Sequence, residues 1–362
     1  MSNTPLLNTA VIGAGMISVA HCTGYSRNPH CRLVAVSDPL EERAKGASAR
    51  FGVKYYIDYR DILADESIDL VSICTPDHTH ADIAVQALEA GKHVVLEKPM
   101  ATTLEDCDRI IDAMRSSNRQ LTVDFEYRYN PFFYTMKDSA ERGELGELKA
   151  MSIYYWRHPF NVKPGGWVHK SRYTTMMIQE GCHYVDLLGW ICGEIETVWA
   201  WSAKVREDVG FEQVLFGELA HKNGVHSQYS HTVAGNQIRH NVWLIGTASA
   251  IYGTMVYSTT HGSFAEIMHK KHKKEIADDI KGDFSVKCFG EKEVSDDDVI
   301  PSLINDFVSR IVQKRPPGVT AYDGRKSIEV ALALEESARK KAEVALPLDH
   351  TPEFILARFK SS

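Results

Sequence analysis

Residues 9–18 read TAVIGAGMIS and hold the pattern that decides the fold. An apolar run predicts a strand over residues 9–13, and a helical pattern follows the Gly-Ala-Gly turn from Ile17. Gly13 permits a tight turn, and Gly15 lets a phosphate approach the backbone at a helix start, where N–H groups and the helix dipole favour negative charge. Ser18 takes the third position, where a small side chain allows close helix–strand packing. Taken alone, such a turn is common.

The first 125 residues alternate short apolar runs with amphipathic stretches. The runs predict strands at 9–13, 32–37, 70–74, 93–97 and 120–124, and the stretches predict helices at 17–26, 40–51, 80–90 and 104–116. Strands separated by helices of this length indicate βαβ units and a doubly wound parallel sheet. Nearly unbroken apolar strands agree with this, because helices would cover both faces.

The pattern changes after residue 125, where longer segments alternate apolar and polar residues. We expect strands at 149–155, 197–204, 225–232, 238–245, 250–257 and 283–289, and helices at 181–192, 301–313 and 324–342. Alternation suits an antiparallel sheet with one packed and one open face. The sequence therefore predicts an N-terminal domain of residues 1–125 and an α+β domain of residues 126–362. The run HKKHKK at 269–274 reads as a solvated helix face or loop, with anion binding as the alternative.

Composition narrows the class of protein. The net charge is −7 and the pI is about 6.1, which gives no reason to expect nucleic acid or an anionic membrane as a partner. The start of the sequence lacks the pattern of a signal peptide, and no apolar run has the 18 or so residues that span a bilayer. The seven cysteines form no Cys-x-x-Cys pair, which is typical of reduced thiols and predicts a cytoplasmic protein.

Asp38 directly follows the second predicted strand, within Ser-Asp-Pro at 37–39. An acidic side chain at this point of a βαβ unit accepts hydrogen bonds from the adenosine ribose hydroxyls and repels a 2′-phosphate. The alternative is a cap for the helix that follows. In the context of the glycine turn, Asp38 favours NAD over NADP, and Arg43 is the residue that keeps NADP open.

Polar residues also follow the next two strands, in TPDHTH at 75–80 and EKP at 97–99. Ligands in open α/β sheets bind beyond the carboxyl ends of the strands. Pro99 stops its strand, and a Glu97-Lys98 pair at the mouth of a buried strand is costly unless it has a role. A surface salt bridge is the alternative.

These motifs together resemble the Gfo/Idh/MocA family of oxidoreductases. The resemblance extends downstream to RYNP at 128–131, GCHYVD at 181–186 and TAYDGR at 320–325, and so covers nearly the whole chain. It implies an N-terminal Rossmann domain followed by an α+β domain with a large, mostly antiparallel sheet. It also implies a homodimer or homotetramer built on that sheet.

The resemblance implies that Lys98 is the catalytic lysine and His183 the acid/base that exchanges a proton with the substrate hydroxyl. Imidazole has the pKa closest to neutral, and a lysine ammonium stabilises a developing alkoxide. The alternative for His183 is a buried helical histidine with a backbone partner. The implied cofactor-binding residues are Gly13, Gly15, Met16, Ile17, Asp38, Arg43, Thr75, Pro76, His80, Glu97, Lys98 and Arg128.

One position departs from the family. Many members carry an aspartate four residues before the histidine, and here that residue is Gln179, followed by Glu180. Gln179 can orient a hydroxyl but cannot act as a base. The enzyme therefore uses Lys98 and His183 alone on an uncommon substrate, or Glu180 replaces the aspartate after a register shift, or the dehydrogenase activity is weak. We favour the first.

Aromatic faces that pack on sugar C–H groups, with polar donors around them, are typical of carbohydrate sites. The candidate substrate residues are Trp156, His158, Trp167, Arg172 and Gln179. They lie in the segments 154–158 and 167–172, which we expect to form the substrate wall, and core or interface positions are the alternative for about half of the aromatic residues there. No histidine pair at i and i+4 and no carboxylate triad accompanies His183, so no metal is expected.

The sequence thus predicts an NAD(H)-dependent oxidoreductase that transfers a hydride between nicotinamide and a carbinol carbon of a sugar, cyclitol or related polyol. A second hypothesis uses the same hydride step transiently, so that the net reaction is redox-neutral glycoside cleavage or a lyase reaction. A third is a non-catalytic, sugar-sensing regulator that keeps the fold.

Overall fold

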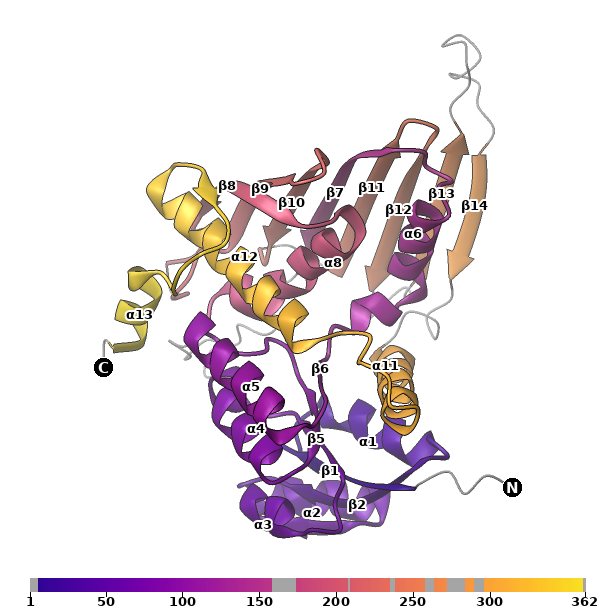
Figure 1. Cartoon of the computed structure of the whole chain (residues 1–362). Coiled ribbons are helices and arrows are strands. Elements are labelled where there is room, and N and C mark those ends of the chain that lie inside the picture. Colours follow the sequence, from indigo (N-terminus) through magenta and orange to yellow (C-terminus); the bar gives the residue numbers. More distant parts are fainter. Residues whose placement is uncertain are drawn as a thin grey trace. The chain divides into compact units, whose positions relative to one another are not determined.

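The computed structural model describes residues 6–157, 174–207, 209–234, 238–257, 264–271, 284–289 and 296–360. The chain divides into two compact units, and each is described by itself (Figure 1). Unit 1 comprises Met1–Tyr129 and Ser295–Ile328, and unit 2 comprises Asn130–Val294 and Glu329–Ser362. None of the helices in the described ranges is both long and apolar enough to cross a bilayer.

Unit 1 is built on a six-stranded parallel sheet in the order β3-β2-β1-β4-β5-β6. Its strands are β1 (Leu7–Ile12), β2 (Cys31–Ser37), β3 (Lys54–Tyr56), β4 (Leu70–Ile73), β5 (His93–Leu96) and β6 (Leu121–Val123). Its first helices are α1 (Ser18–Arg27), α2 (Glu41–Phe51), α3 (Tyr59–Ala64), α4 (His80–Glu89) and α5 (Leu104–Ser117). The predicted Rossmann arrangement is confirmed. The strand order reverses between β1 and β4, which is where doubly wound sheets bind ligands.

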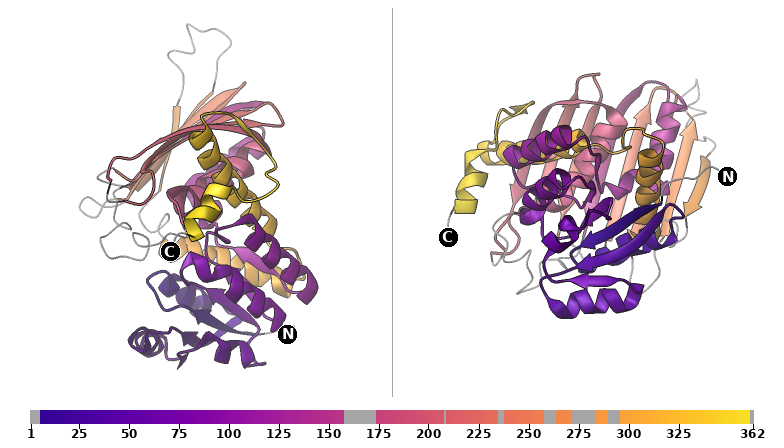
Figure 2. Two further views of the ribbon diagram at one scale, coloured as in Figure 1. Left: turned by 90° about the vertical axis from the view of Figure 1, so that its left-hand side faces the viewer. Right: turned by 60° about the horizontal axis from the view of Figure 1, so that its bottom comes forward.

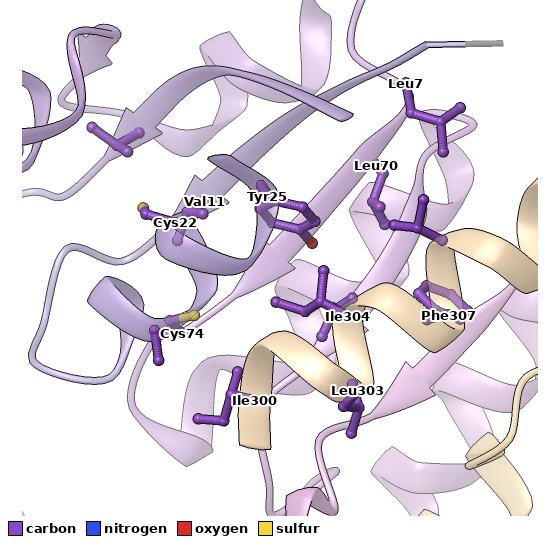
Figure 3. Close-up of a cluster of buried hydrophobic side chains, with 14 residues drawn as sticks. Leu7, Val11, Cys22, Tyr25, Leu70, Cys74, Ile300, Leu303, Ile304 and Phe307 are labelled. Carbon is purple, nitrogen blue, oxygen red and sulfur yellow. The ribbon is translucent and has the colours of Figure 1, made fainter. Parts of the chain in front are cut away.

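Helix α11 (Asp296–Val312) belongs to unit 1, although residues 130–294 of unit 2 separate it in sequence from the N-terminal part of that unit. Its Ile304 and Phe307 are buried in one cluster with Val11 of β1 and Tyr25 of α1 (Figure 3). Each buried side chain of this size contributes roughly 1.5–3 kcal/mol to stability. Compact packing therefore divides the chain differently from the single predicted boundary after residue 125, because an apolar helix face from late in the sequence completes the N-terminal core.

Unit 2 contains a nine-stranded sheet in the order β14-β13-β12-β11-β7-β10-β9-β8-β15. Its strands are β7 (Leu148–Trp156), β8 (Ile195–Ala203), β9 (Val214–His221), β10 (His226–Thr232), β11 (Ile238–Gly246), β12 (Ser249–Tyr257), β13 (Phe264–Lys271), β14 (Phe284–Phe289) and β15 (Val344–Ala345). Neighbouring strands are antiparallel except for β7 and β10, which run parallel. The predicted large, mostly antiparallel sheet is confirmed.

The basic run at 269–274 corrects one expectation. His269, Lys270 and Lys271 lie in strand β13, paired with β12 and β14, so a helix face or loop is wrong for these three residues. The Oγ atom of Ser249 lies 2.8 Å from Nε2 of His269. Long cationic side chains suit a strand that is only partly covered, because their charged ends reach water. Residues 272–274 lie outside the described residues.

Helices cover one face of the nine-stranded sheet (Figures 1 and 2). These are α6 (Pro131–Glu141), α8 (Cys182–Cys192) and the part of α12 (Ala321–Lys340) that lies in unit 2, and α13 (Glu353–Lys360) follows. Ser337 of α12 accepts a hydrogen bond from the backbone N–H of Ala200 at 2.9 Å, which ties α12 to β8. On the opposite face, Trp199 and Trp201 of β8 are 44% and 49% exposed, and no helix in the described part of unit 2 covers them.

Candidate active site

The glycine turn between β1 and α1 has the geometry that its sequence predicts. Gly13 has φ +92°, and a Cβ atom there would lie 2.4 Å from the carbonyl oxygen of Cys74. A Cβ atom at Gly15 would meet no atom within 4 Å, so this side of the turn is open. Ser18 donates a hydrogen bond to the Gly15 carbonyl at 2.6 Å and is buried in the position expected for a small residue. The turn thus leaves room at the start of α1 for a phosphate group.

Asp38 follows β2 and is 6% exposed. Its Oδ2 atom accepts a hydrogen bond from the backbone N–H of Ala14, and Oδ1 accepts one from Leu40, each at 2.9 Å. The carboxylate therefore links the glycine turn to the start of α2. Two carboxylate oxygens offer about four lone-pair sites, so Asp38 keeps acceptor capacity for ribose hydroxyls. The carboxyl ends of β1 and β2 therefore offer an open glycine turn and an acidic side chain beside it, and both features fit a bound dinucleotide.

His80 joins the loops that follow β4 and β5. Its Nδ1 atom lies 2.7 Å from the carbonyl oxygen of Pro99, and its Nε2 atom lies 2.9 Å from that of Thr75. The ring is almost fully buried. Both partners are backbone carbonyl groups, one from each loop. His80 was predicted to bind the cofactor, and the structure shows that its two nitrogen atoms are engaged with the backbone of two predicted cofactor loops, which include Thr75-Pro76 and Lys98.

Glu97 and Lys98 directly follow β5. The Glu97 side chain is buried, and its Oε2 atom accepts the backbone N–H of Lys98 at 3.1 Å. Its other oxygen, Oε1, lies 2.9 Å from Nε2 of His21 on α1. Burial opposes ionisation of Glu97, but the His21 hydrogen bond and charge, with the charge of Lys98, hold the pKa of this carboxyl below its ordinary value. Glu97 is therefore held by the buried His21 and in turn holds the Lys98 backbone. The alternative of a surface salt bridge does not apply, because the Glu97 side chain is buried.

Two downstream motifs meet in unit 1. A side-chain nitrogen of Arg128 lies 3.0 Å from Oδ1 of Asp323, and the Arg128 side chain is only 9% exposed. Asp323 also caps the start of α12, because its Oδ2 accepts from the N–H and the hydroxyl of Thr320. Burial opposes its ionisation, but Arg128 and Thr320 keep the pKa of Asp323 below its ordinary value. Arg128 and Asp323 therefore join two segments of unit 1 that lie far apart in the sequence.

His183 lies in the first turn of α8 in unit 2 and is 3% exposed. The preceding turn, Met177–Gly181, is π-helical and contains Gln179 and Glu180. Hydrogen bonds in a π-turn span five residues, so regular α-helical spacing does not by itself place Gln179 one turn from His183. Turns of this kind are frequent at functional sites.

Glu180 forms a buried ion pair with Arg157, the residue that follows β7. Burial opposes a charge on the arginine, and the Glu180 carboxylate raises the pKa of Arg157 above its ordinary value. Removing one partner of a buried pair costs roughly 3–5 kcal/mol. The pair therefore weighs against Glu180 as the replacement for the missing aspartate, because a free base would have to leave Arg157.

The remaining predicted residues lie at different places. Met16 and Arg43 are exposed beside the glycine turn and on α2, and Trp156 is exposed at the end of β7. His158, Trp167 and Arg172 lie outside the described residues. Sequence reasoning missed His21 and Asp124, and it placed Arg157 in the expected substrate wall without its ion pair to Glu180. The signals available were an acidic residue at the end of the strand predicted at 120–124 for Asp124 and a polar residue on an apolar helix face for His21.

Comparisons with known proteins agree with this geometry. Residues 7–125 match a model described as the oxidoreductase family with an NAD-binding Rossmann fold, and residues 133–252 match the GFO/IDH/MocA C-terminal domain. A two-domain dinucleotide-binding protein is thus the class that the fold and the motifs define. The chain belongs to the Gfo/Idh/MocA family, whose N-terminal domain binds NAD.

Two curated relatives and one solved structure illustrate the similarity. Levoglucosan dehydrogenase of Pseudarthrobacter phenanthrenivorans is 32% identical over 212 residues, which is 53% of each chain. Myo-inositol 2-dehydrogenase of Thermotoga maritima is 25% identical over 350 residues, 94% of this chain and 98% of that one. A structure of levoglucosan dehydrogenase with NADH and levoglucosan has a TM-score of 0.82 at 23% identity over 94% of this chain and 100% of that chain, and shows the shared fold. The chain spans about half the length of the first curated relatives it matches.

Proposed function

We propose that this chain is an NAD(H)-dependent oxidoreductase that transfers a hydride between nicotinamide and a carbinol carbon of a sugar, cyclitol or related polyol. One observation carries the proposal: the open glycine turn, Asp38 and the anchored Glu97-Lys98 pair follow strands β1, β2 and β5 at the same edge of one parallel sheet. The relatives named for inositol and levoglucosan support the class of substrate. Asp38 supports NAD over NADP, because a carboxylate repels a 2′-phosphate.

Two side chains handle the hydroxyl proton in this proposal. Bound NAD⁺ would supply the hydride acceptor, and NADH the donor in the reverse direction. Lys98 holds an ammonium beside the substrate oxygen and stabilises the negative charge that develops there. His183 accepts the hydroxyl proton. Gln179 orients a hydroxyl without taking a proton. Glu180 remains paired with Arg157.

A substitution of Lys98 tests this assignment. Lys98→Ala should abolish turnover and leave the dissociation constant of NADH within about threefold of the parent, since the alkoxide charge develops only in the reaction. The measurements are nicotinamide absorbance with a panel of polyols and NADH fluorescence titration. Lys54→Ala, which removes an exposed lysine of β3, serves as the control. Turnover of Lys98→Ala at the parental rate would show the mechanism to be wrong, and product formed without net NADH would indicate the redox-neutral reaction.

We also propose that the open face of the nine-stranded sheet holds two copies of the chain together. Trp201 of β8 and Phe216 of β9 are cross-strand partners with ring centroids 6.1 Å apart, and both are exposed. On β11, Trp243 is 50% exposed and lies 4.6 Å from the ring of Tyr252. Exposed aromatic groups of this extent are typical of protein interfaces.

A further inference from the structure

Three ionisable side chains meet in the interior of unit 1, and one of them is Glu97, the residue before Lys98. His21 comes from α1, Glu97 follows β5 and Asp124 follows β6. The Nε2 atom of His21 lies 2.9 Å from Oε1 of Glu97 and 3.2 Å from Oδ2 of Asp124. None of the three side chains is more than 9% exposed. We call these residues the buried triad.

Hydrogen bonds extend from the triad in two directions. The Nδ1 atom of His21 lies 3.0 Å from the Ser72 hydroxyl, which lies 2.6 Å from the Tyr25 hydroxyl. On the other side, Oε2 of Glu97 accepts the backbone N–H of Lys98 at 3.1 Å. A continuous chain of contacts therefore runs from the core of unit 1 to the backbone of Lys98.

We propose that His21 and Asp124 are positioning residues for Lys98, which act through the carboxylate of Glu97. The inference rests on the proposed function of Lys98. Because His21 holds one oxygen of Glu97, the second oxygen stays directed at the Lys98 N–H and fixes the backbone from which the lysine side chain extends. Neither His21 nor Asp124 needs to touch the substrate for this role.

The protonation states follow from the surroundings. Burial opposes a charge on His21, but Cys74, Asp124 and Glu97 together raise its pKa well above the ordinary value. Burial and the charge of Glu97 raise the pKa of Asp124 to about 7. An imidazolium at His21, a carboxylate at Glu97 and a protonated Asp124 therefore balance the buried charges below neutral pH.

A metal ion is the other occupant that this arrangement suggests, because the three ligand atoms lie within 4.8 Å of one another. A metal would require a neutral His21 with its Nε2 lone pair free. The contact from Nε2 to Oε1 of Glu97 is instead a hydrogen bond, and Oδ2 of Asp124 lies within ion-pair distance of the same nitrogen atom. The other ionisable neighbours in the described part of unit 1 include Cys22, Tyr25, Cys74, His80 and Lys98. The side of α11 that packs on α1 is apolar.

Substitution of His21 separates positioning from stability. His21→Leu should lower kcat about tenfold and change the NADH dissociation constant less than about threefold, and His21→Gln, which keeps an N–H donor, should recover part of the loss. Thr122→Val is the control, since it deletes a buried hydrogen bond on β6, to the Val319 carbonyl, outside the triad. A parental kcat in His21→Leu, or the same kcat loss in Thr122→Val, would overturn the proposal.

The pH dependence tests Asp124. When Asp124 loses its proton, His21 is shared between two carboxylates and holds Glu97 less firmly, so kcat of the parent should fall as pH rises through about 7. Asp124→Asn mimics the protonated state and should lack this fall. An unchanged pH profile in Asp124→Asn would contradict the role of Asp124.

Unfolding measurements provide a readout that does not depend on turnover. From about pH 4 to about pH 7 the folded parent keeps an Asp124 proton that the unfolded chain has released, so its stability should fall as pH rises, and fall less in Asp124→Asn. Equal slopes, or one tightly bound metal per chain by elemental analysis, would disprove the proposed protonation. If no polyol is turned over while the dependence of stability on pH still differs between the parent and Asp124→Asn as expected, that result would contradict the proposed function and still support the protonation proposed for the buried triad.

Discussion

Both oxygens of Asp38 accept backbone hydrogen bonds, one from the glycine turn and one from the start of α2. These bonds give the side chain a local structural role, although Asp38 is not the N-cap residue of α2, and binding of the ribose hydroxyls stays a prediction. If Asp38 also selects the cofactor as proposed, a substitution there changes cofactor choice and local stability together, so the experiment has to separate the two effects.

Asp38→Ala should lower the preference for NADH over NADPH by about tenfold, because it removes the charge that repels a 2′-phosphate. Fluorescence titration with both reduced cofactors measures the ratio of their dissociation constants. Asp58→Ala is the matched control, since Asp58 caps α3 by accepting the N–H of Arg60 and should cost only about 1 kcal/mol of stability. An unchanged ratio in Asp38→Ala would remove Asp38 from the ribose site.

At the scale of elements, the β1–α1 turn contains two glycines. The backbone conformation requires glycine at Gly13, whereas at Gly15 the absence of a side chain leaves space for a ligand. Gly13→Ala should destabilise the chain by roughly 2–4 kcal/mol, because of its positive φ and the approach to the Cys74 carbonyl. Gly15→Ala should cost less than about 1 kcal/mol and still weaken NADH binding, because its Cβ would occupy space left for the phosphates. Denaturant unfolding and NADH titration measure the two effects. Full NADH affinity in Gly15→Ala would show that no phosphate approaches there.

The buried strands of unit 1 could be predicted because each is a short apolar run between helical patterns, whereas the six-residue helix α3 was missed. Strand β3 was missed because its three residues, Lys54–Tyr56, are largely exposed and carry no such run. The return of α11 could not be predicted, since an apolar helix face does not specify which core it completes. Its start was also predicted too late, at Pro301, because proline is common in a first helical turn, whereas α11 begins at Asp296.

The candidate site was predictable where residues follow buried strands, as at Asp38 and Glu97-Lys98. It was less predictable where an interaction joins distant segments. No spacing in the sequence indicates that His21 contacts Glu97 and Asp124, or that Arg157 pairs with Glu180. Such contacts depend on tertiary packing, which cannot be inferred from the local sequence pattern.

At the scale of the whole molecule, the open face of the nine-stranded sheet predicts self-association. Replacing Trp201 and Trp243 together with aspartate should weaken assembly at least about 100-fold, because buried aromatic residues commonly contribute 2 kcal/mol or more each to an interface. Light scattering after size exclusion measures the mass. Tyr134→Asp, at an exposed aromatic residue of α6, is the control. A parent chain that remains monomeric at all concentrations would contradict the proposal.

The central claim is that a hydride passes between nicotinamide and a carbinol carbon. The most direct test is to incubate the protein with NAD⁺ and a polyol that carries deuterium on its carbinol carbons, and to analyse the nicotinamide by mass spectrometry. We predict NADH that carries one deuterium per molecule of ketone formed, and none with Lys98→Ala. A ketone formed without deuterium in the cofactor would contradict the account.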